Sequence, residues 1–145
     1  MLQDVEKEIA AIELPSRPEG LYEPIGYCLK NGGKRIRPLM TLLGCELFGG
    51  SVGQALAPAI GLELFHNFTL LHDDIMDNAP IRRGQASVYH KWNANTAILS
   101  GDALFSLACQ YVGRVPDACL REVNELFHKT VLEVCEGQQY DMNFE

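Results

Sequence analysis

Apolar residues recur along the chain at the three- to four-residue spacing of amphipathic helices, and alternation with a period of two is missing. The pattern predicts helices over residues 2–14, 21–30, 38–48, 51–77, 95–112 and 117–141, with a polar loop over 78–89. Turn-forming residues follow several of these segments, among them Pro15, Gly32, Gly33, Gly49 and Gly50. The sequence therefore predicts an all-α protein.

The segment 51–77 differs from the others because its first half is apolar on nearly every side. Ser51 and Gln54 have the spacing of a capping box at its start, and Pro80 follows its end. A helix without a polar face is buried, so this helix is predicted to be central in a helical bundle.

Three aspartates, Asp73, Asp74 and Asp77, stand at the end of this helix in the segment DDIMD. At about 100° per residue, Asp73 and Asp77 lie one turn apart on one face, and Asp74 flanks them. Carboxylates this close repel one another, and the negative end of the helix dipole adds to the repulsion. A solvated acidic helix end is one interpretation. We favour a site for a hard divalent cation, and oxygen ligands of this kind suit Mg²⁺.

The helix face that leads to the aspartates is polar as well. His66 lies two turns before Asp73 on the same face, and Thr69 lies between them. A polar stripe on an otherwise apolar helix indicates the wall of a cavity. His72 faces another direction, and its spacing from His66 does not make a zinc pair on one face.

Two basic segments complement the acidic one. In GGKRIRP (32–38), two glycines, three cations and the start of a helix suit a phosphate, although a solvated basic loop is the simpler interpretation. Just past the aspartates, the adjacent Arg82 and Arg83 point in different directions and can serve two anions. The final helix carries an apolar stripe that turns polar, which indicates a second cavity wall: Val123, Phe127, Val131, Val134, Gln138 and Asp141.

Composition narrows the class of protein. The 12 basic and 19 acidic residues give a net charge of −7, which argues against a nucleic-acid partner. The N-terminus is not a signal peptide and no apolar stretch reaches membrane-spanning length, so we expect a cytoplasmic protein. Five widely spaced cysteines without a CxxC pair are expected to be free thiols: Cys28, Cys45, Cys109, Cys119 and Cys135.

Taken in order, the motifs GGKRIRP, DDIMD, RRG (82–84), GD (101–102) and GQQYD (137–141) resemble those of the trans-isoprenyl diphosphate synthases, or polyprenyl synthetases. Five motifs in family order are a specific match. The resemblance implies an isoprenoid-synthase helical bundle around the central helix, usually a homodimer. It also implies Mg²⁺-dependent condensation of an allylic diphosphate with isopentenyl diphosphate, which yields a longer trans-prenyl diphosphate.

The resemblance assigns roles to individual residues. Asp73, Asp74 and Asp77 would bind Mg²⁺ and so the allylic diphosphate, which Arg82 would also touch. Gln138 and Asp141 would support this allylic side, whereas isopentenyl diphosphate would be held by Lys34, Arg37, His66 and Arg83. An aromatic residue five positions before the aspartates marks short-chain members, so Phe68 would limit the product to C15 or C20. Helical projection nevertheless brings Thr69 closer to the aspartate face.

Family members are longer and carry a second aspartate-rich motif, which is missing from residues 1–145. We therefore expect the chain to be the front, N-terminal half of a single synthase domain and a poor catalyst by itself. Two alternatives stay open: a non-catalytic half-length partner of a full-length synthase, and a fragment of a class I terpene cyclase. GGKRIRP and Arg83 speak against the cyclase, because a cyclase needs no second diphosphate site.

Overall fold

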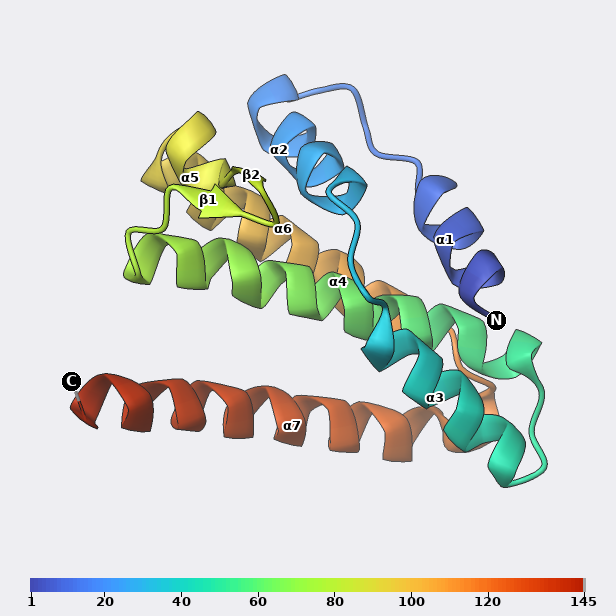
Figure 1. Ribbon diagram of the computed structural model, residues 1–145. Coiled ribbons are helices and arrows are strands. Elements are labelled where there is room, and N and C mark those ends of the chain that lie inside the picture. Colours follow the sequence, from blue (N-terminus) through green and yellow to red (C-terminus); the bar gives the residue numbers. More distant parts are fainter. Residues whose placement is uncertain (145) are drawn as a thin grey trace.

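The computed structural model describes residues 1–144 and shows an arrangement of helices with one small hairpin (Figure 1). The elements are α1 (Leu2–Ala10), α2 (Glu19–Lys30), α3 (Ile36–Leu47), α4 (Val52–Met76), β1 (Ile81–Arg82), β2 (Gln85–Ala86), α5 (Val88–Lys91), α6 (Ala94–Val112) and α7 (Asp117–Phe144). The all-α prediction is confirmed. Within the described part of the chain, none of the helices has the length and hydrophobicity needed to cross a bilayer.

Helix α4 lies at the centre, packed against α6 along much of its length and against α3 near its start (Figure 1). Gln54 Oε1 accepts a hydrogen bond from the Ser51 backbone N–H (2.9 Å), so the predicted capping box is present. Ile60 and Leu64 of α4 are fully buried together with Leu104 of α6. The central position predicted for this helix is confirmed.

At two points α4 and α6 approach too closely to leave room for a side chain. A Cβ added to Gly61 of α4 would lie 2.7 Å from Val112 Cγ2 and 3.0 Å from the Ala108 carbonyl oxygen. A Cβ added to Gly101 of α6 would overlap the His72 ring. These two contacts set how α4 is rotated against its neighbour, and therefore which of its side chains face the interior.

The segment 78–89, predicted to be a loop, contains the β1–β2 hairpin and the short helix α5. Arg83 (φ 53°) and Gly84 (φ 79°) are both left-handed, the conformation of a two-residue hairpin turn. Ile81 pairs with Ala86, and Arg82 pairs with Gln85. The prediction was wrong because two-residue strands are too short to produce a recognisable alternation.

The first predicted helix, 2–14, was too long, because α1 ends at Ala10. Ile9 of α1 is buried, and Leu14 packs beside Gly26 of α2. In a continuous helix Leu14 would lie about 140° around the axis from Ile9. The non-helical segment allows both side chains to reach the core.

Helix α7 has the predicted position but a more exposed surface than predicted. Of its apolar stripe, Phe127 is buried and Val123 and Val131 are partly buried, whereas Val134 is 41% exposed. The interpretation of a buried stripe was therefore wrong at Val134, because no described element covers the C-terminal half of α7.

All five cysteines are free thiols, as predicted. Cys28 is the most buried of them, and its Sγ–H donates to Asn67 Oδ1 (3.5 Å). Burial raises the pKa of the Cys28 thiol to about 12. This thiol is consequently neutral and serves as a small core residue.

Gly61→Ala tests the close contact of α4 and α6. We expect a loss of about 1–3 kcal/mol in the free energy of unfolding, because the added methyl group overlaps Val112 and backbone atoms that cannot move alone. Urea denaturation followed by circular dichroism measures the change. Gly53→Ala is the control, since a Cβ there meets nothing within 4 Å. Equal stability of both variants would show that the contact does not constrain the helices.

Candidate active site

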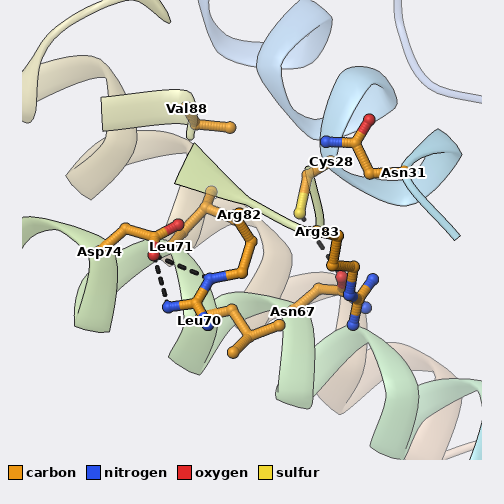
Figure 2. A pocket seen from close by; sticks show the side chains of 9 residues that line it. All are labelled: Cys28, Asn31, Asn67, Leu70, Leu71, Asp74, Arg82, Arg83 and Val88. Atoms are coloured by element: carbon orange, nitrogen blue, oxygen red, sulfur yellow. Dashed lines mark hydrogen bonds and ion pairs between the residues drawn. The ribbon is translucent and has the colours of Figure 1, made fainter. Parts of the chain in front are cut away.

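The acidic end of α4 contains two kinds of carboxylate. Asp74 is 3% exposed, and its Oδ1 accepts hydrogen bonds from Arg82 Nε (2.8 Å) and Nη2 (2.5 Å), as Figure 2 shows. Asp73 is partly buried and Asp77 is exposed. Burial, and next the charge of Asp77, raise the pKa of the Asp73 carboxyl above its usual value. Negative charge at Asp73 and Asp77 is therefore incompletely compensated.

This uncompensated charge fits a divalent cation. Asp73 and Asp77 offer oxygen ligands. A cation bound by them would offset both burial and the repulsion from Asp77, which together raise the pKa of Asp73. Among residues 1–144, the side chains do not assemble a group of three metal ligands by themselves. Mg²⁺ typically keeps several waters and is completed by substrate phosphates, so a small protein ligand set suits it.

A second site lies beside α4, where the residues expected to hold isopentenyl diphosphate meet. A cavity of about 500 Å³ is lined by Asn31, Gly33, Lys34, Arg35, Ile36, Arg37, Glu63, His66 and Arg83. The structure thus brings Lys34, Arg37, His66 and Arg83 together from three separate segments. The concentration of cations gives this basic pocket the character of an anion site.

His66 is an uncharged group among the cations of the basic pocket. Burial, followed by the nearby charge of Arg37, lowers the pKa of His66 to about 4. At neutral pH the imidazole is therefore neutral, and it can donate or accept a hydrogen bond.

The hairpin directs its two arginines to different sites, as predicted. Arg82 reaches Asp74 at the acidic end, whereas Arg83 Nη1 donates to the Gly32 carbonyl oxygen at the basic pocket. The Arg83 guanidinium packs closely against Gly33. A Cβ added to Gly33 would lie 3.2 Å from Arg83 Cζ. A cavity of about 20 Å³ separates the two arginines, which is room for one water molecule (Figure 2).

Arg35, one of the three cations of GGKRIRP, is turned away from solvent and is 2% exposed. It donates from Nη1 to Glu63 Oε1 (2.7 Å) and from Nε to Glu6 Oε1 (2.8 Å). Sequence reasoning missed this network. The signal that could have revealed it is Glu63, a carboxylate in an apolar stretch of the central helix that needs a buried cation.

Gln138 and Asp141, the residues expected on the second cavity wall, make no described contact with the aspartates. Gln138 is partly buried and Asp141 is exposed, on the part of α7 that points toward the same end of the molecule as the end of α4 (Figure 1). Within residues 1–144, no hydrogen bond or ion pair joins either of them to the aspartates of α4. Their role stays a prediction.

Phe68 belongs to an aromatic group between α4 and α6. Its ring centroid lies 5.3 Å from that of Phe105 and 4.6 Å from that of His72. Thr69 donates from Oγ1 to the His66 carbonyl oxygen (2.8 Å). His72 faces α6, where its Nε2 lies 3.2 Å from the Ile98 carbonyl oxygen. The assignment of Phe68 or Thr69 to control of product length stays a prediction.

Comparison with known proteins decides the family. Residues 18–145 match the family model of the polyprenyl synthetases. The chain belongs to the polyprenyl synthetase family. It is 44% identical over 132 residues to a geranylgeranyl diphosphate synthase of Methanosarcina mazei, covering 90% of this chain and 41% of the relative. It is 42% identical over 144 residues to a geranylgeranyl pyrophosphate synthase of Geoglobus acetivorans, covering 97% and 45%.

Solved structures confirm the isoprenoid-synthase fold of the chain. The crystal structure of a geranylgeranyl pyrophosphate synthetase from Pyrococcus horikoshii superposes with a TM-score of 0.92 at 40% identity, covering 99% of this chain and 45% of that one. The chain spans less than half the length of the curated relatives named above. The similarity thus holds for the region that contains α1 to α7.

The low pKa of His66 predicts how the stability of the protein depends on pH. The unfolded chain takes up a proton near pH 6.5, whereas folded His66 takes it up near pH 4. Because the unfolded state binds more protons in this window, the contribution of His66 is complete above pH 6.5 and is lost as pH falls toward 4.

NMR titration of the His66 ring protons should give a midpoint near pH 4. In urea denaturation, His66→Gln should flatten the loss of stability between pH 6.5 and 4. His128→Gln, a change at an exposed histidine of α7, controls for the loss of a histidine. A midpoint near 6.5 would contradict the neutral state assigned to His66.

Proposed function

We propose that the protein takes part in Mg²⁺-dependent prenyl transfer. In this reaction an allylic diphosphate loses its diphosphate, the resulting carbocation alkylates the double bond of isopentenyl diphosphate, and loss of a proton gives the longer prenyl diphosphate. The observation that carries the proposal is that an acidic site and a basic site lie beside the same helix. One offers carboxylates suited to a metal, and the other offers cations suited to direct contact with phosphate. Relatives named geranylgeranyl diphosphate synthase support it. We further infer that the chain is the N-terminal part of a single synthase domain.

On the allylic side, Asp73 and Asp77 would hold the metal, with Asp74 and Arg82 beside them. Mg²⁺, when bound, neutralises the diphosphate and stabilises the charge that develops as it leaves. The hydrogen bonds from Arg82 to Asp74 leave this arginine 34% exposed, so its guanidinium is also accessible to the leaving group. The side chains of this end thus orient the diphosphate.

On the nucleophile side, Lys34, Arg37 and Arg83 would hold isopentenyl diphosphate by direct charge, and neutral His66 would supply a hydrogen bond. Isopentenyl diphosphate keeps its diphosphate, so this site needs no metal to activate a leaving group. A terpene cyclase has only the allylic diphosphate to bind, and the basic pocket therefore favours prenyl elongation over cyclisation.

We propose a C15 or C20 product. Relatives named geranylgeranyl diphosphate synthase support C20, and the aromatic group around Phe68 supplies bulk one to two turns before Asp73. A homodimer also remains a proposal. The exposed Ile98 (41%) and Leu99 (60%) on α6 support it, because they give this helix an apolar outer surface.

Binding of an allylic diphosphate should depend on the metal, because the diphosphate and the aspartates repel each other. In titration calorimetry with geranyl diphosphate, we expect binding with Mg²⁺ and almost none with EDTA. Asp73→Asn should weaken the Mg²⁺-dependent binding by about tenfold or more. Glu46→Gln, at an exposed position of α3, should leave it unchanged. Equal affinity in Mg²⁺ and EDTA would refute the metal assignment.

Phe68→Ala tests the assignment of product length. In a full-length enzyme that carries this segment, we expect products longer than those of the wild type, measured by chromatography, because the substitution removes the bulk of an aromatic ring from the group packed between α4 and α6. Phe144→Ala, at a residue that is 88% exposed, is the control. Unchanged products would remove Phe68 from this role, and a wild-type product beyond C25 would overturn the C15–C20 proposal.

A further inference from the structure

We propose that Arg35 is a positioning residue of the basic pocket: clamped by Glu63 and Glu6, it orients the flanking Lys34 and Arg37 toward an anion without binding that anion itself. The inference deepens the proposed function, because that function identifies the anion as isopentenyl diphosphate. It assigns different tasks to three cations that lie within four consecutive residues.

The hydrogen bonds of Arg35 are directed into the protein. Nη1 donates to Glu63 and Nε to Glu6, and Nη2 lies 3.4 Å from the Leu29 carbonyl oxygen. The side chain is 1% exposed, compared with 3% for Glu63 and 47% for Glu6. The guanidinium charge is therefore matched by carboxylates. Lys34 and Arg37, by contrast, are exposed at the same cavity.

The backbone explains why this clamp affects the neighbouring side chains. Arg35 has φ 49° and ψ 33°, a left-handed conformation, immediately before α3. For a residue with a Cβ this conformation costs energy and persists only where the surroundings hold it. Here two carboxylates from other helices hold the side chain. The left-handed residue turns the chain so that Lys34 before it and Arg37 after it line one cavity.

The clamp also connects the pocket to the rest of the molecule. Glu63 lies one turn before His66 on α4, and both residues line the basic pocket. Glu6 belongs to α1. Arg35 therefore joins the start of α3 to α1 and α4, and so holds the cations of the loop in register with His66.

The clamp and simple electrostatics predict opposite effects of removing the Glu63 charge on the affinity for isopentenyl diphosphate, which allows a decisive test. Glu63 lines the basic pocket, and a carboxylate there repels an anion. If Glu63 contributed only its charge, the nearly isosteric Glu63→Gln would bind isopentenyl diphosphate more tightly. If Glu63 clamps Arg35, the same substitution releases the loop and weakens binding. The sign of the change separates the two.

The experiment is titration calorimetry of the 145-residue chain with isopentenyl diphosphate. We expect Glu63→Gln to weaken binding by about tenfold or more, because misplaced ligands lose affinity steeply. Affinity for geranyl diphosphate with Mg²⁺ should stay unchanged, which a general structural defect would not allow. Glu46→Gln is the matched control. Equal or tighter binding of isopentenyl diphosphate by Glu63→Gln would overturn the inference.

Glu63→Gln removes the buried carboxylate that pairs with Arg35. Circular dichroism is therefore measured with each titration to check that the variant is still helical. Glu6→Gln and Arg35→Lys keep the test decisive if Glu63→Gln does not fold. Glu6 is the more exposed partner, and its change should weaken binding less than the loss of Glu63. A lysine keeps the charge but cannot hold both carboxylates. Wild-type affinity in both of these variants would overturn the inference.

A second measurement separates this inference from the proposed function. If the wild-type chain does not bind isopentenyl diphosphate, the proposed function fails, and trypsin then decides the positioning role. Release of the loop should speed cleavage after Lys34 and Arg35 in Glu63→Gln relative to Glu46→Gln, whereas the Arg37–Pro38 bond resists trypsin in both. Equal cleavage rates in the two variants would refute the clamp.

Discussion

The close packing of α4 on α6 determines the position of every charged group in the candidate site. Gly61 and Gly101 leave no space between the helices for a side chain, so α4 has one rotation relative to α6. In that rotation Glu63 and Asp74 face the interior, whereas His66 and Asp73 lie on a more open side. A different rotation would bury other side chains of the same helix and separate the two sites.

Burying two carboxylates on a central helix is costly unless each has a cation, and this requirement organises the loops. Arg35 pairs with Glu63, and Arg82 pairs with Asp74. Both arginines come from non-helical or hairpin segments, which can place a guanidinium where a regular helix cannot. Their neighbours Lys34, Arg37 and Arg83 line the basic pocket instead. In each segment, one cation pairs with a buried carboxylate, and the cations beside it line the basic pocket.

The hairpin adds a geometric constraint between the two proposed diphosphate sites. A two-residue turn with left-handed Arg83 and Gly84 sends consecutive arginines to the acidic end and to the basic pocket. Prenyl transfer requires the two substrates at close range and in a defined orientation. A tight turn between the arginines keeps the separation of the two sites more constant than a longer and more flexible loop would.

Periodicity and residue type are local properties, and they were enough to predict the main helices, the central place of α4 and the charge of the acidic and basic clusters. The sequence also contained the ordered motifs that indicated the family. The end of α1, the hairpin at 81–86 and the exposure of Val134 depend on packing between elements and were not predictable from local pattern. The tertiary structure alone decided that Arg35 turns inward while Lys34 and Arg37 line the pocket. The physical reason is that the direction of a charged side chain depends on partners far along the chain: those of Arg35 are 28 and 29 residues away.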